Sequence, residues 1–86
     1  MSEVTVEHLG DQKYTVKVEQ FTYEVTLSDE YYRELTGGKI PPENLIKISF
    51  EFLLTKEGPE AILKQFDLPE ISRFFPEYED VIRNQV

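Results

Sequence analysis

The sequence predicts a single α+β domain over residues 1–86, in which a three-stranded antiparallel β-meander is covered on one face by four to five helices. Three observations predict this fold. Residues 3–27 alternate apolar and polar side chains with a period of two, the pattern of half-buried strands. From residue 28 the spacing becomes helical, with Pro-Glu pairs between segments. With 40% of its 86 residues hydrophobic, the chain has the size and composition of one small domain.

Three strands are expected at 3–8, 13–18 and 21–27, where Val, Thr, Tyr and Phe dominate. A turn at Glu19-Gln20 keeps the apolar side chains of the second and third strands on one face. The predicted inner face is apolar and consists of Val4, Val6, Tyr14, Val16, Val18, Phe21, Tyr23, Val25 and Leu27. The predicted outer face is polar and consists of Glu3, Thr5, Glu7, Lys13, Thr15, Lys17, Thr22, Glu24 and Thr26.

The first connection has two candidate registers. A two-residue turn at Gly10-Asp11 would place Val6 opposite Thr15 and would mix apolar with polar side chains on each face. A three-residue loop over 9–11 instead places Val6 opposite Tyr14 and keeps the two faces distinct. The sequence therefore predicts the longer loop.

Helices are expected at 29–36, 42–56, 59–66, 68–75 and 77–84. The first follows a candidate N-cap serine and ends at a pair of glycines. The other four begin at or beside Pro-Glu pairs. Proline loses no hydrogen bond in the first turn of a helix, and the glutamate meets the positive end of the helix dipole.

The 42–56 segment is the most informative helix. Its apolar residues spread over roughly 240° of the circumference, compared with the ~100° stripe of a surface helix. Such a helix must be covered on more than one side. We expect the sheet to cover one side and the residues after 58 to cover another.

Composition excludes several classes of function. The formal net charge of −8 is spread along the chain, so no basic segment is available for phosphates and we expect no direct binding of nucleic acid. The chain has no cysteine and a single histidine, His8, which gives no convincing zinc site or catalytic triad. We therefore expect no catalytic, cofactor-binding or metal-binding residues, no cofactor and no enzymatic activity.

The predicted location of the protein follows from the lack of a membrane-spanning segment and of a signal peptide in the sequence. The longest apolar run, 45–54, is interrupted by polar residues and is shorter than the ~18–20 residues of a membrane span. The N-terminus has neither a basic start nor an apolar segment typical of a signal peptide. We expect a cytoplasmic protein that does not bind membranes.

The stretch FDLPEISRFFPEYED, residues 66–80, allows two interpretations. The helices expected at 59–66 and 68–75 resemble a helix-turn-helix in outline, but the second offers one basic residue, Arg73, beside acids. The stretch can instead close the core, beginning with a capping box formed by Asp67 and Glu70. Core closure is the interpretation that the residue types favour.

If this stretch closes the core, Leu68, Ile71 and Phe74 are expected to point inward from one side of the helix. An exposed Phe75 beside Tyr78 and Arg73 would then form an aromatic and arginine patch of the kind that dominates binding hot spots. These three residues are the candidate partner-binding site.

Two segments carry a resemblance to a known family. SFEFLL at 49–54 and FDLPEISRFFPEYE at 66–79 resemble sequences in a family of short uncharacterised bacterial proteins, a domain of unknown function. The resemblance covers mainly 45–80, and Lys64-Gln65 departs from the basic residues expected before the second segment. It implies a bacterial, cytoplasmic protein, and it implies no activity, cofactor or catalytic residue.

The predicted function is that of a small non-enzymatic interaction module, which binds a protein partner or itself. Two alternatives stay open: a small regulatory protein whose C-terminal half acts on nucleic acid as a helix-turn-helix, and a weakly marked enzyme. The acidic charge and the lack of nucleophile–base pairs favour the interaction module.

Overall fold

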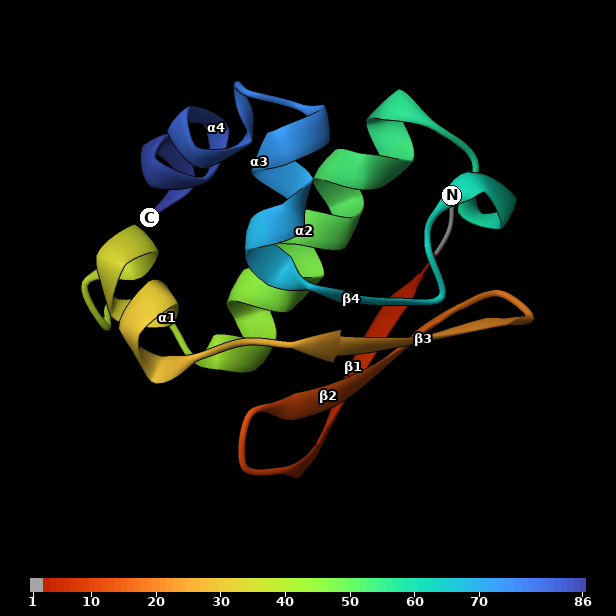
Figure 1. Cartoon of the computed structure of the whole chain (residues 1–86), viewed down its shortest axis with the longest axis horizontal. Coiled ribbons are helices and arrows are strands. Elements are labelled where there is room, and N and C mark those ends of the chain that lie inside the picture. The colour runs from red at the N-terminus through yellow and green to blue at the C-terminus, as the bar shows by residue number, and fades with distance from the viewer. Residues whose placement is uncertain (1–2) are drawn as a thin grey trace.

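The computed structural model describes residues 3–86 and has an α+β architecture, with a four-stranded sheet covered by helices on one face (Figure 1). The first half contains β1 (Val4–Gly10), β2 (Lys13–Val18), β3 (Phe21–Thr26), α1 (Asp29–Thr36) and α2 (Pro42–Lys56). The second half contains the 3₁₀ turn η1 (Pro59–Ala61), β4 (Gln65–Asp67), the 3₁₀ turn η2 (Leu68–Glu70), α3 (Ile71–Phe74) and α4 (Tyr78–Gln85).

The first three strands form the predicted antiparallel meander. The second hairpin has the predicted register, with Val18 opposite Phe21 and Tyr14 opposite Val25. Glu19 adopts a φ of 55° in its turn. The favoured two-residue hairpin turns share this positive φ at their first central position, which lets a turn without glycine keep the strand twist.

The register of the first hairpin differs from the prediction by two residues. Val6 lies opposite Val16 rather than opposite Tyr14. The chain turns at Asp11-Gln12, and a β-bulge at Leu9 adds one unpaired residue to β1. The extra residue restores the alternation that a two-residue turn would otherwise invert. The separation of apolar and polar faces was thus predicted correctly, and the loop was not.

The helix predicted at 59–66 is wrong. The chain forms η1 there and then β4, which pairs in parallel with β3 and places Phe66 beside Val25. The sheet is therefore mixed and four-stranded, not only a three-stranded meander. Phe66 and Leu68 are buried, whereas Asp67 between them is exposed, and this alternation suits an extended segment.

The remaining helices lie close to their predicted positions. α1 and α2 have the predicted bounds. The segment 68–75 forms η2 followed by a single turn, α3, and α4 begins one residue after the predicted 77. The predicted capping box is present, since the backbone N–H of Asp67 donates to Oε2 of Glu70 at 2.9 Å.

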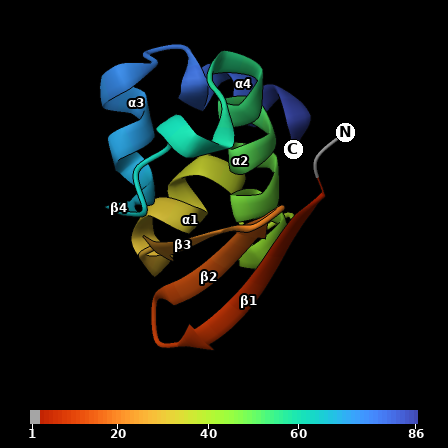
Figure 2. The same cartoon turned by 90° about the vertical axis from the view of Figure 1, so that its right-hand side faces the viewer.

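α2 lies at the centre of the molecule, between the sheet and the C-terminal segment (Figure 2). Leu45, Ile46 and Phe50 of this helix are fully buried. The Phe50 ring centroid lies 5.1 Å from that of Tyr23 on β3 and 5.9 Å from that of Phe66 on β4. On another side of the helix, the Phe52 ring centroid lies 5.5 Å from that of Tyr78 on α4, so α2 is covered on two sides, as its apolar circumference requires.

Tyr78 attaches α4 to α2. Its side chain is fully buried, and its hydroxyl lies 2.6 Å from Oγ of Ser49. Because the Ser49 hydroxyl donates to the carbonyl of Leu45 at 2.7 Å, the Tyr78 hydroxyl is the donor to Ser49. Neither hydroxyl is left without a partner, so the pair costs little desolvation.

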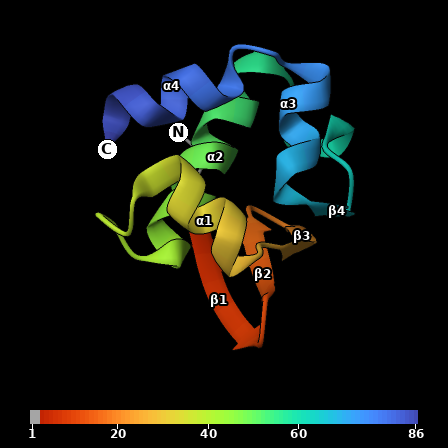
Figure 3. The same ribbon diagram turned by 60° about the vertical axis from the view of Figure 1, so that its left-hand side comes forward.

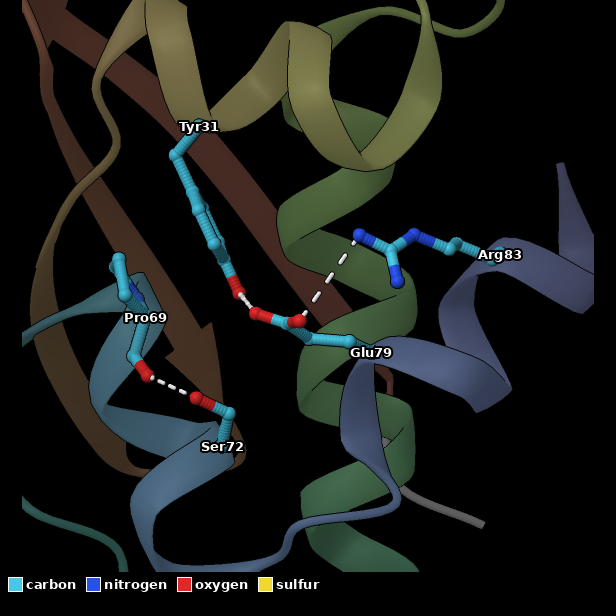
Figure 4. Close-up of polar contacts among 5 residues, drawn as sticks. All are labelled: Tyr31, Pro69, Ser72, Glu79 and Arg83. Carbon is cyan, nitrogen blue, oxygen red and sulfur yellow. Dashed lines mark hydrogen bonds and ion pairs between the residues drawn. The ribbon is translucent and has the colours of Figure 1, made fainter.

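A second link joins α4 to α1, which lie side by side in Figure 3. The Tyr31 hydroxyl donates to Oε2 of Glu79 at 2.9 Å, and Arg83 lies 4.0 Å from the other oxygen of that carboxylate (Figure 4). At the junction of η2 and α3, the Ser72 hydroxyl donates to the carbonyl of Pro69 at 2.8 Å. Of these contacts, the bond between Tyr31 and Glu79 holds α4 against the rest of the fold, and the other two are local.

We predict that Phe50→Ala lowers the free energy of unfolding by about 3–5 kcal/mol, because it empties a buried aromatic site. Phe74→Ala is the matched control, since the Phe74 side chain is 66% exposed, and it should change stability by no more than about 0.5 kcal/mol. Urea melts followed by circular dichroism measure both. Equal losses in the two variants would contradict the position of α2.

Alkaline pH should destabilise the fold. Burial is the main cause that raises the pKa values of Tyr14, Tyr23, Tyr31 and Tyr78 above their ordinary value. A raised pKa in the folded state means that the stabilisation is complete below the unfolded-state pKa of about 10 and is lost as the pH rises further. For Tyr78, the decrease in the free energy of unfolding approaches about 1.4 kcal/mol for each pH unit above this value.

Urea melts at a series of pH values from 8 upward measure this loss. Tyr78→Phe should flatten the dependence above about pH 10, because the variant has one buried phenol fewer to ionise on unfolding. An unchanged slope in the variant would show that Tyr78 does not contribute to the alkaline loss.

Candidate functional site

A hollow of about 220 Å³ with a largely apolar lining lies where the C-terminal end of α2 meets η1, β4 and α3. We call this hollow the apolar groove. Its lining consists of eight apolar residues and two acids: Leu53, Ala61, Ile62, Leu63, Phe66, Ile71, Phe74, Phe75, Glu57 and Glu70.

The floor of the groove belongs to the hydrophobic core. Leu53, Ile62, Phe66 and Ile71 are all buried and pack in the same cluster as α2 and the sheet. These side chains come from α2, β4, α3 and the connection between η1 and β4, and each packs in the core. The groove is therefore a preformed feature of the fold.

The rim of the groove carries exposed apolar side chains. Phe74 is 66% exposed and Leu63 is 53% exposed, and they are two of the three large hydrophobic side chains that are exposed within residues 3–86. The third, Leu9, lies in the bulge of β1. Single exposed hydrophobic residues are common on proteins, but here two of them line one apolar hollow, which adds to its exposed apolar surface.

The structure separates the three residues predicted to bind a partner. Phe75 lines the groove and is half-buried, with its ring edge-on to Phe52 at 5.9 Å between centroids. Arg73 is exposed on α3 but does not line the groove. Tyr78 is fully buried and offers no surface to a partner.

The expected inward orientation of Phe74 is wrong. At about 100° per residue, Phe74 lies about 60° from Ile71 on one side of a helix and Phe75 lies about 40° from it on the other. Both rings therefore lie near the buried side of the turn. The position of the neighbouring helix decides which of the two rings is buried. Phe52 of α2 packs against Phe75, which leaves Phe74 outside.

Three further residues of the groove were not expected from the sequence, namely Glu57, Leu63 and Glu70. Leu63 did carry a signal, because neighbours in an extended segment point to opposite sides and Ile62 already faces the core. The helix expected at 59–66 concealed this signal. Nothing in the spacing of Glu57 and Glu70 marks them as neighbours of one hollow.

The helix-turn-helix interpretation required two consecutive helices, at 59–66 and 68–75. Within the part of the chain that the structure describes, the first of these is replaced by η1 and β4, and α3 has only four residues. Among residues 3–86, the outer face of the sheet is polar and carries no aromatic side chain on which a base could stack.

Residues 3–86 offer neither a metal site nor a membrane-spanning helix. No group of three or more His, Asp or Glu side chains in this range is arranged to hold a metal ion. No helix in the same range has both the length and the apolar character needed to cross a membrane.

The chain was compared with protein-family models, with curated proteins and with solved structures, and none of the three comparisons gave a match. The resemblance to short bacterial proteins therefore stays a prediction, and the function is inferred from the groove itself.

Proposed function

We propose that this chain is a non-enzymatic protein-interaction domain whose apolar groove binds a segment of another polypeptide. The observation that carries the proposal is that two exposed side chains, Phe74 and Leu63, line the same hollow, whose floor consists of core residues. A large apolar side chain of the partner fits this hollow, in the way that hot-spot residues fill desolvated pockets.

The size and chemistry of the groove favour a side chain over a small molecule. Its volume of about 220 Å³ is below the ~300–1,000 Å³ typical of pockets for small-molecule ligands. Its polar lining consists of two carboxylates, with no nucleophile or histidine beside them. These features support a recognition surface rather than a catalytic one.

A different polypeptide is a better occupant than a second copy of this chain. Each copy has a formal net charge of −8, so two copies repel one another as they approach. In a symmetric dimer the same patch lies on both sides of the interface, which would bring the acids of the two grooves together. The lack of cysteine and the resemblance to short bacterial proteins support a cytoplasmic setting.

Selection from a random-peptide library tests this proposal. Phage selected on the wild-type protein and counter-selected on Phe74→Ser should yield peptides with a large apolar anchor. In synthetic form, such a peptide should bind Leu63→Ser about 10- to 30-fold more weakly than wild type, as expected for the loss of a hot-spot contact. Fluorescence anisotropy gives the dissociation constants.

Leu9→Ser is the matched control, because Leu9 and Leu63 are both 53% exposed and Leu9 lies on β1, outside the groove. It should leave binding unchanged, and thermal melts should show all three variants folded. An equal loss of binding in Leu9→Ser, or the absence of any peptide that depends on Phe74, would refute the proposal.

A further inference from the structure

We infer that the partner segment is basic, with Lys or Arg beside the apolar side chain that enters the apolar groove. This inference rests on the proposed function and specifies the chemistry of the partner. It is drawn from the charges in and around the groove, which are negative, and from the exposed aromatic ring on its rim.

The two polar residues of the lining are both carboxylates, Glu57 and Glu70. Glu70 accepts the backbone N–H of Asp67 through Oε2, and this bond holds the carboxylate in place. Glu57 is the C-cap residue of α2, fixed by the bond from its backbone N–H to the carbonyl of Leu53 at 3.0 Å. Both acids are half-buried and line the hollow, so each can meet a side chain that enters it.

The neighbouring basic residues do not neutralise the lining. The Lys56 ammonium lies 3.0 Å from Oε2 of Glu77 and also over the ring of Phe52. A hydrogen bond from its own backbone, followed by the bond from Lys56, lowers the pKa of Glu77, so the acid stays charged beside the ammonium. A second base, Lys64, lies 5.4 Å above the centre of the Phe21 ring, and a third, Arg73, does not line the groove.

Residues 57–77 supply nine of the ten lining residues. This segment contains five acids and two bases: Glu57, Glu60, Asp67, Glu70, Glu77, Lys64 and Arg73. The surroundings of the groove are therefore acidic, like the chain as a whole with its charge of −8. A basic segment would be attracted from a distance, and this attraction would weaken with added salt.

Phe74 gives the rim a second means of binding a cation. An ammonium or guanidinium group is attracted to the face of an aromatic ring, and arginine is the side chain most often found there. A ring that is 66% exposed leaves room for such a contact. Carboxylates on the lining beside an aromatic rim thus favour a cationic side chain next to the apolar anchor.

The peptides selected on the groove test this inference. The enriched peptides should carry Lys or Arg next to the anchor. Replacing those bases by Gln should weaken binding about tenfold at about 50 mM salt, equivalent to about 1.4 kcal/mol. At about 500 mM salt the difference should shrink to about twofold, because exposed charges are then screened.

Paired substitutions locate the effect on the protein. Glu57→Gln with Glu70→Gln should reduce the affinity for the basic peptide about tenfold and leave the Gln peptide unaffected. Gln at 70 can still accept the N–H of Asp67, so the capping box is kept. Glu3→Gln with Glu7→Gln removes the same charge from exposed positions at β1 and should change binding by less than about twofold.

Three outcomes of these experiments would contradict the inference. Equal binding of the basic and Gln peptides would overturn this inference and leave the proposed function standing. Equal effects of the two paired substitutions would also overturn it, because net charge rather than the groove would then be recognised. If no selected peptide depends on Phe74, both the proposed function and this inference fall.

Discussion

The constraint on which the rest of the structure depends is the apolar circumference of α2. A helix that is apolar on most sides cannot lie on a sheet with its other face in water, because the uncovered face would leave large side chains exposed. The sheet covers one side of α2, and the chain after 58 folds back over another. In this second layer Phe75 packs against Phe52, and Tyr78 is hydrogen-bonded to Ser49.

The second layer is built from short pieces, and that determines where the groove forms. Prolines at 59, 69 and 76 divide the segment, so no helix there is long enough to cover α2 smoothly. Each piece instead places one or two apolar side chains on α2, and the hollow is left where η1, β4 and α3 approach its C-terminal end. Tyr31 and Glu79 then fix α4 on the other side, next to α1.

Local patterns predicted the parts of the fold that local physics decides. The Glu19-Gln20 turn, the bounds of α2 and the Asp67–Glu70 capping box all depend on residues close in sequence. β4 could not be found in this way, because its three residues are a strand only by pairing with β3, some forty positions earlier. The same applies to the groove, since the partner of Phe75 is Phe52 of a different element.

The exposure of Phe74 is not explained by the fold alone. Phe74 is the last residue of α3, a single helical turn, and its side chain is exposed. A polar side chain at this position would expose less apolar surface to water and would disturb no contact in the core. Leu63 is likewise exposed, next to the buried Ile62. Stability therefore gives no reason for large apolar side chains at these two positions on one hollow. A partner that covers these two side chains does give a reason, because binding would then bury the apolar surface that folding leaves exposed.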